Sequence, residues 1–215
     1  MIDSYKDLTI NKYIQIRKVL QEDGGELNIQ TNIIAILNDM TVDEVLALKL
    51  DKYHELVVRS AFLMNKPEVA PKAPDKIIVN GRECVVTKNV RKLTTAQYID
   101  YQTITALPNS DDMIANVLAC FIVPKGFKYG DGYDVDEIAN WLGENLSIVD
   151  AFNICFFFRK KYLNSISFTL RYLELQTRMM KRTEKNQEVK EKLTEAIAKM
   201  KELQTALLEN GAGWQ

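Results

Sequence analysis

Few residues in this sequence have the type and spacing that catalysis or metal binding requires. The single histidine, His54, has no histidine or cysteine near it at metal-ligand spacing, whereas a zinc site needs three or four such ligands. We therefore interpret His54 as a residue on the surface of a helix. The cysteines, Cys84, Cys120 and Cys155, are odd in number, widely spaced and set among apolar residues. This pattern predicts reduced thiols in the core.

One glycine-rich stretch, residues 126–134, could in principle bind a phosphate or a cation. It lacks the Gly-Lys-Ser/Thr ending of a phosphate-binding loop, and no strong strand pattern precedes it. The acids Asp131, Asp134 and Asp136 do not have the spacing of a calcium-binding loop. The stretch is therefore predicted to be a structural turn.

The remaining charged residues are explained by helix chemistry. The carboxylates Glu137, Glu144 and Asp150 are interpreted as acids of first helical turns or of solvent-facing helix sides. The basic runs Arg159–Lys161 and Arg178–Arg182 are interpreted as solvated faces, and the second run is the candidate for contact with nucleic acid. No enzyme, cofactor or metal site is predicted, because no nucleophile, base and ligand set comes together in the sequence.

Composition indicates a globular chain of one or two domains. The 215 residues are 47% apolar and 27% charged, and the net charge is −1. A near-neutral chain does not suit a general role on nucleic acid or anionic membranes. No apolar run approaches the roughly 18 residues of a membrane helix. The polar N-terminus lacks a secretory signal, which with the cysteine usage predicts a cytosolic compartment.

An internal repeat organises the first three quarters of the chain. Residues 6–15 and 91–100 share Leu-Thr followed by Tyr-Ile, and residues 32–36 and 43–45 match 116–120 and 136–138 in the same order. We interpret this as a duplicated helical module whose second copy contains an extra loop. The alternative is that Leu-Thr with Tyr-Ile is merely a common helix start.

Helix starts can be placed within both copies. Thr94 and Gln97 have the spacing of a capping box, as do Thr41 with Glu44 and Ser147 with Asp150. Each copy is predicted to hold four short helices, too few to bury both faces alone. The two copies should therefore share a core. The expected helices begin or lie at Thr9, 29–37, Thr41 and 53–64, and then at Thr94, 111–121, Val135 and 148–158.

A small hairpin is predicted between the copies. Pro67, Pro71 and Pro74 exclude a helix there. Asn80-Gly81 then separates two β-branched runs, which is a strong hairpin signal because both turn residues tolerate positive φ. A lone hairpin is marginally stable, so it should pack on a helix or pair with another strand.

The C-terminal part shows a heptad pattern. Positions that alternate by four and three residues predict a long helix of coiled-coil character, with self-association through Val189, Leu193, Met200, Leu203 and Leu207. Arg182 and Asn186 weaken the middle of this seam. Either Asn186 sets the register of an oligomer, or the helix breaks near Thr183 and folds back as a hairpin within its own chain.

The predicted fold class is therefore mainly α. It comprises two repeated short-helix modules joined by a small β-hairpin, and a long C-terminal helix. The predicted segments are 1–66 (first module), 67–92 (linker and hairpin), 93–164 (second module) and 165–215 (C-terminal helix).

Four segments of the sequence together form a familiar pattern: Leu-Thr-Thr-Ala-Gln-Tyr-Ile-Asp at 93–100, the loop at 121–134, Glu-Asn-Leu-Ser-Ile-Val-Asp-Ala at 144–151 and Phe-Phe-Phe at 156–158. They resemble structural-module proteins of tailed bacteriophages, and most closely tail assembly chaperone-type proteins. The resemblance covers roughly residues 90–160. It implies a helical, non-catalytic protein that binds other phage structural proteins in the host cytoplasm during infection.

This resemblance leads to specific expectations about partners. The candidate partner contacts are Phe152, Phe156, Phe157, Tyr162 and Leu163, and the C-terminal helix would form a homo-oligomer. One alternative is a permanent virion component, such as a head-to-tail connector or an internal protein. A second alternative is a nucleic-acid-binding protein that uses Arg178–Arg182. No membrane partner is expected.

Overall fold

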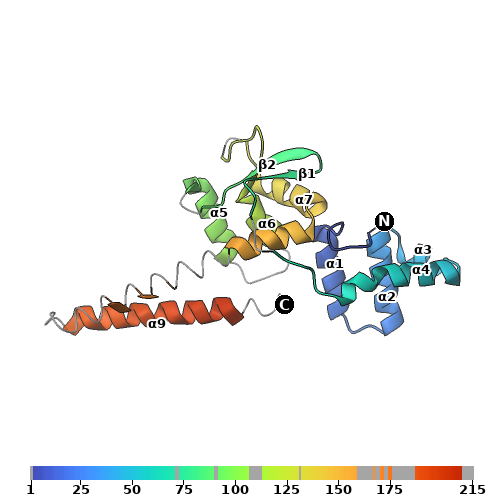
Figure 1. Ribbon diagram of the computed structural model, residues 1–215, viewed down its shortest axis with the longest axis horizontal. Coiled ribbons are helices and arrows are strands. Elements are labelled where there is room, and N and C mark those ends of the chain that lie inside the picture. The colour runs from blue at the N-terminus through green and yellow to red at the C-terminus, as the bar shows by residue number, and fades with distance from the viewer. Residues whose placement is uncertain are drawn as a thin grey trace. The chain divides into compact units, whose positions relative to one another are not determined.

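The computed structural model describes residues 2–70, 73–89, 92–106, 113–130, 132–158, 167, 170–171, 174–175 and 187–209. This part of the chain is mostly helical, with a small antiparallel sheet (Figure 1). It divides into two compact units, Met1–Phe156 and Phe157–Gln215. None of its helices combines the length and apolar content that a membrane crossing requires.

The first unit holds the segment of the first predicted module, the predicted linker with its hairpin, and the second predicted module as far as Phe156. A helical segment at residues 148–158 follows α7. The elements are α1 (Ile10–Gln21), α2 (Glu26–Asn38), α3 (Val42–Leu46), α4 (Leu50–Ser60), the 3-10 helix η1 (Ala61–Met64), β1 (Lys76–Val79), β2 (Arg82–Val86), α5 (Thr95–Ala106), α6 (Met113–Ala119), β3 (Ile122–Pro124) and α7 (Val135–Asn145).

The predicted helix starts are confirmed. Thr94 and Gln97 form both halves of a capping box, with Thr94 N donating to Gln97 Oε1 at 2.9 Å and Gln97 N to Thr94 Oγ1 at 3.2 Å. Thr41 and Glu44 form a second box. Ser147 accepts from the backbone of Asp150 at 3.4 Å, which is one half of the third. The helix expected at 53–64 is α4 followed by η1.

The hairpin is confirmed, and its sheet has a strand that the sequence did not predict. Asn80 and Gly81 have φ of 46° and 75°, as a type I′ turn requires. β1 pairs with β2, and β2 pairs on its other side with β3, both antiparallel. Two residues separate the end of α6 from the start of β3, so a strand of the second module completes the sheet of the linker.

The two modules are joined along the chain entering α1. Thr9 forms an antiparallel bridge with Ser147. Ile10 N donates to Leu146 O at 3.2 Å, and Ile148 N donates to Leu8 O at 2.8 Å. Leu8, Ile10, Leu146 and Ile148 are all buried. The start of α1 and the end of α7 therefore meet at a junction of paired backbone and buried apolar side chains.

The second unit contains α9 (Gln187–Glu209), which is the latter half of the expected C-terminal helix. Glu174 is also helical and forms an ion pair with Lys201 at 2.9 Å. Two residues 27 positions apart on one continuous helix would be separated by about 40 Å. Glu174 and Lys201 therefore belong to separate segments that lie alongside each other. The long C-terminal helix is therefore not confirmed, and the ion pair fits the helical-hairpin alternative.

Candidate functional site

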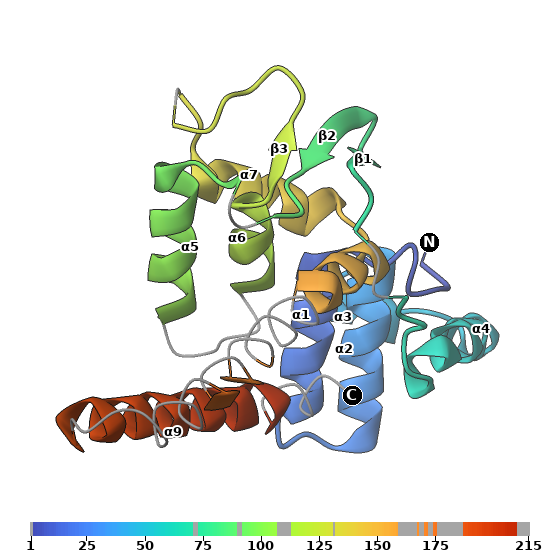
Figure 2. The same ribbon diagram turned by 60° about the vertical axis from the view of Figure 1, so that its left-hand side comes forward.

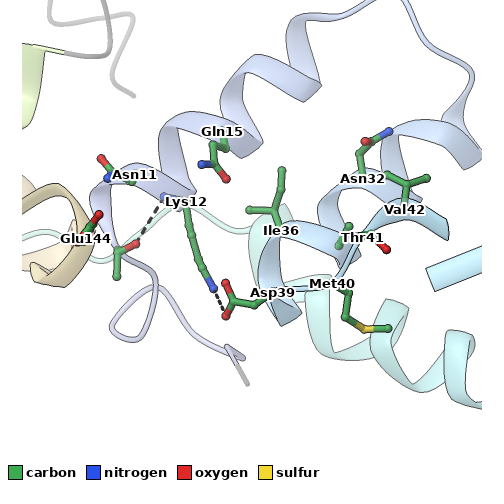
Figure 3. A pocket seen from close by; sticks show the side chains of 12 residues that line it. Asn11, Lys12, Gln15, Asn32, Ile36, Asp39, Met40, Thr41, Val42 and Glu144 are labelled. Atoms are coloured by element: carbon green, nitrogen blue, oxygen red, sulfur yellow. Dashed lines mark hydrogen bonds and ion pairs between the residues drawn. The ribbon is translucent and has the colours of Figure 1, made fainter. Parts of the chain in front are cut away.

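The candidate site is a cleft in the first unit between α1 and α2, bordered on one side by the start of α3 and on the other by Glu144 of α7 (Figure 3). Figure 2 shows α1 and α2 side by side, with α3 beside them. The cleft has a volume of about 580 Å³. It is lined by Thr9, Asn11, Lys12, Gln15, Asn32, Ala35, Ile36, Asp39, Met40, Thr41, Val42 and Glu144.

Helical periodicity orients α1 toward the cleft. Ile10 and Ile14, four residues apart, are buried and fix one face of the helix in the core. Asn11, Lys12 and Gln15 consequently lie on a neighbouring face, which lines the cleft. The start of α1 is fixed because Thr9 Oγ1 accepts from Lys12 N at 3.5 Å.

Helix α2 forms the opposite wall of the cleft, and its buried residues again determine which side faces the cleft. Ile34 and Leu37 are buried, and Ile34 belongs to a small core that includes Val45 and Leu56. Asn32 and Ile36 lie on the cleft side of α2. Asn32 Nδ2 donates to the backbone oxygen of Asn28 at 2.9 Å, which holds this amide along its own helix.

An ion pair crosses the cleft at the end of α2. Lys12 Nζ lies 2.7 Å from Asp39 Oδ2, and the Asp39 side chain is 80% exposed against 19% for Lys12. Asp39 caps α2 in the left-handed conformation, with φ of 54°, a region that aspartate and asparagine tolerate better than most residues. Because the pair is half open to water, it contributes at most about 1 kcal/mol to stability.

The capping box fixes the third wall. Thr41 N donates to Glu44 Oε2 at 2.6 Å, and Glu44 N donates to Thr41 Oγ1 at 3.2 Å. The backbone N–H of Thr41, followed by its hydroxyl, lowers the pKa of Glu44, so this carboxylate stays ionised as a cap. Met40 and Val42 are thereby held at the end of the cleft.

Close contact between α1 and α7 places Glu144 at the cleft. A Cβ atom added to Gly143 would meet the Asn11 side-chain amide, so glycine allows that amide to lie against α7 in its present position. The neighbouring residue, Glu144, then lines the cleft from the second module. The site thus draws on both modules.

The lining chemistry suits the binding of a polypeptide segment. The amides of Asn11 and Gln15 can donate and accept hydrogen bonds, as a peptide backbone requires of its partner, and the Asn32 amide oxygen can accept one. Ile36 and Met40 offer apolar contacts beside them. One lysine and two carboxylates, from Asp39 and Glu144, give the lining a net negative charge, which favours a segment carrying a basic side chain.

The predicted partner contacts do not lie in this cleft. Phe152 is 2% exposed and packs edge-to-face on Tyr13, with ring centroids 5.3 Å apart, so it is a core residue in this structure. Phe156 packs edge-to-face on Phe152 and is half-buried, as is Phe157. Tyr162 and Leu163 lie outside the described residues.

The self-association candidates are described only in part. All five lie on α9, but only Met200, which is half-buried, has a described side chain. The side chains of Val189, Leu193, Leu203 and Leu207 lie outside the described part of the chain. The basic run Arg178–Arg182 lies outside it as well.

The glycine-rich stretch is a structural turn, as predicted. Gly126, Gly130 and Gly132 all have positive φ. Tyr129 and Tyr133 anchor the loop to the second module: the Tyr129 hydroxyl donates to Asp100 Oδ2 at 2.7 Å, and the Tyr133 hydroxyl donates to the Ala119 oxygen at 2.8 Å. Within the described residues, no three His, Cys, Asp or Glu side chains gather as a metal site would require.

The potentially reactive side chains are placed largely as the sequence predicted. The three cysteines are free; Cys84 and Cys120 are buried, as expected of core thiols, whereas Cys155 is half-buried. Burial raises the pKa of Cys120 to about 11, so its thiol is protonated at neutral pH and a poor nucleophile. His54 is exposed on α4.

Sequence reasoning did not find the cleft. Its members come from α1, α2, α3 and α7, so no local spacing links them. The one local signal is the pair of amides Asn11 and Gln15, whose spacing of four residues places them on the same face of the helix after Thr9. Comparison of this chain with protein-family models, with curated proteins and with solved structures finds no match.

Proposed function

We propose that this chain is a phage assembly protein of the tail assembly chaperone type, which binds a segment of another phage structural protein in the α1–α2–α3 cleft. The observation that carries the proposal is the lining of the cleft, where amides and an ion pair surround apolar side chains. Such a lining serves recognition of a peptide, with apolar contacts for affinity and polar groups for orientation. The resemblance of roughly residues 90–160 to that family supports the choice of partner.

The size of the cleft limits what enters it. At about 580 Å³ it accommodates a few side chains of a partner segment, not a folded domain. The partner segment therefore has to be extended or helical and accessible before assembly. A chaperone that holds one segment of an unassembled structural protein meets this requirement.

A matched pair of tryptophan variants tests the proposal. Gln15→Trp fills the cleft from an exposed position, so it should fold normally and block the partner. Lys18→Trp is exposed on the same helix but does not line the cleft. Affinity capture from phage-producing cells, read by mass spectrometry, should recover a phage structural protein with the natural chain and with Lys18→Trp. Recovery should fall about tenfold or more with Gln15→Trp. Equal recovery with both variants would contradict the proposal.

Particle composition separates a chaperone from a virion component. A transient chaperone should be abundant in lysates of infected cells and absent from purified particles. Presence of the chain in particles at a fixed ratio to other structural proteins would instead favour a permanent component, such as a connector or an internal protein. Both measurements use the same mass spectrometry.

A further inference from the structure

The outer edge of β1 carries backbone groups without partners. Asp75 O accepts from Val86 N at 2.9 Å, and the antiparallel register pairs Ile77 with Cys84 and Val79 with Arg82. Hydrogen-bonded and non-hydrogen-bonded pairs alternate along such a ladder. The N–H and C=O groups of Lys76 and Ile78 therefore point away from β2. No described residue pairs with them. A second extended chain lying beside β1 could form hydrogen bonds with these N–H and C=O groups.

One face of the sheet is also uncovered next to this edge. Val79, Cys84 and Ile122 are buried on the inner face. On the outer face Ile78 is 77% exposed and Val85 is 44% exposed. The exposed Ile78 side chain leaves apolar surface in contact with water at the edge strand. A strand added beside β1 would cover part of that surface.

Three charges on the outer face define what the added strand should carry. Glu83 is paired with Lys76 at 2.8 Å and with Lys125 at 3.5 Å. One carboxylate between two ammonium groups leaves one positive charge uncompensated. An isolated lysine on an edge strand opposes pairing with another strand, because its charge would have to leave water. Lys76 is already paired with Glu83, so it opposes such pairing less. An acidic side chain directly opposite Lys76 would balance the surplus charge.

We propose that the β1 edge accepts an extended acidic-apolar segment of another protein as a fourth strand. In this arrangement a carboxylate lies opposite Lys76, and an apolar side chain, two residues away on the segment, lies opposite Ile78. Main-chain hydrogen bonds to Lys76 and Ile78 provide the register, as in other strand-addition complexes. The edge lies outside the cleft residues, so the inference does not rest on the proposed function.

Amide hydrogen exchange tests the inference directly. The probe is a short synthetic peptide with the repeat Thr-Asp-Thr-Ile, which places aspartate and isoleucine in turn on one face of a strand. It is added to the full chain. The amides of Lys76 and Ile78 should become protected when the peptide binds, whereas those of Ile77 and Val79, already paired with β2, should change little. Unchanged exchange of Lys76 and Ile78 at saturating peptide would overturn the inference.

Variants and a second peptide sharpen the test. Ile78→Thr keeps a residue suited to a strand and should weaken peptide binding about tenfold or more, because it removes the apolar contact. Met64→Thr removes another highly exposed apolar side chain, away from the sheet, and should leave binding unchanged. The cleft variant Gln15→Trp should also leave peptide binding unchanged, which separates this inference from the proposed function.

Two further results would overturn the inference. A peptide with lysine in place of each aspartate should bind more weakly, and equal binding would remove the argument from charge. Protection of Lys76 and Ile78 that grows with protein concentration, without any peptide, would show that a second copy of the chain occupies the edge.

Discussion

At the scale of single residues, a few side chains determine how the cleft is built. Gly143 allows the Asn11 amide to lie against α7, and Asp39 ends α2 in a left-handed conformation that directs its carboxylate to Lys12. Gln97 is buried and donates from Nε2 to the Cys120 oxygen at 3.0 Å, while its Oε1 serves the capping box. Each of these residues satisfies a geometric or hydrogen-bonding need that most substitutions would leave unmet.

The contact of Gly143 with Asn11 can be tested by a double-mutant cycle. Gly143→Ala should lower the free energy of unfolding by roughly 1 kcal/mol, because the added methyl group meets the Asn11 side chain. With Asn11→Ala present, the same change should be neutral or stabilising, since alanine favours a helix over glycine. Urea unfolding of the four proteins gives the coupling. An identical effect in both backgrounds would rule out the contact as the reason for the glycine.

Buried Cys120 predicts a loss of stability at alkaline pH. Its pKa is about 11 in the folded chain, against 9.0 ordinarily, because burial disfavours the thiolate. A folded-state pKa raised in this way gives stability that is fully present below pH 9 and lost as the pH rises toward 11. Urea unfolding between pH 8 and 11 should show this decline, and a weaker decline for Cys120→Ala. An identical pH dependence in both would argue against a contribution from Cys120.

At the scale of elements, signals that lie close together in the sequence predicted structure well. The capping boxes at Thr41 and Thr94 and the Asn80-Gly81 turn are local, because all their partners lie within a few residues. β3 was missed because its three residues gain their pairing from β2, some forty positions earlier. The cleft was missed for the same reason.

The turn of the hairpin gives the prediction at this scale. Gly81 has φ of +75°, where an L-residue is strained, so Gly81→Ala should cost about 1 kcal/mol. Gly24→Ala is the matched control, since its added Cβ would make only ordinary contacts and its φ is not in the strained region. Thermal unfolding compares the two. A Gly81→Ala protein as stable as the control would contradict the assigned turn.

At the scale of the whole molecule, the second unit departs most from the sequence prediction. A heptad pattern specifies an apolar stripe but does not say whether the stripe packs on another chain or on its own. The ion pair between Glu174 and Lys201 favours packing within the chain. The continuous C-terminal helix is not confirmed, because nothing in the repeat itself distinguishes one long helix from a helical hairpin.

Cross-linking of the natural chain tests this packing. A zero-length carbodiimide reagent should join the Glu174 carboxylate to the Lys201 amine, which lie 2.9 Å apart. In a mixture of isotopically light and heavy chains, the product should be entirely light or entirely heavy, and it should persist on dilution. Mixed-isotope products that vanish on dilution would show instead that the contact joins two copies.

The central proposal is that the cleft binds a segment of a phage structural protein. Site-specific photo-cross-linking tests it most directly. A photoreactive residue replaces Gln15, which lines the cleft, or Lys18, which does not. After irradiation of phage-producing cells, mass spectrometry identifies what each position touched. We predict that the Gln15 position cross-links to one segment of a phage structural protein, and that the Lys18 position does so far less. Equal cross-linking from both positions, or none from Gln15, would contradict the claim.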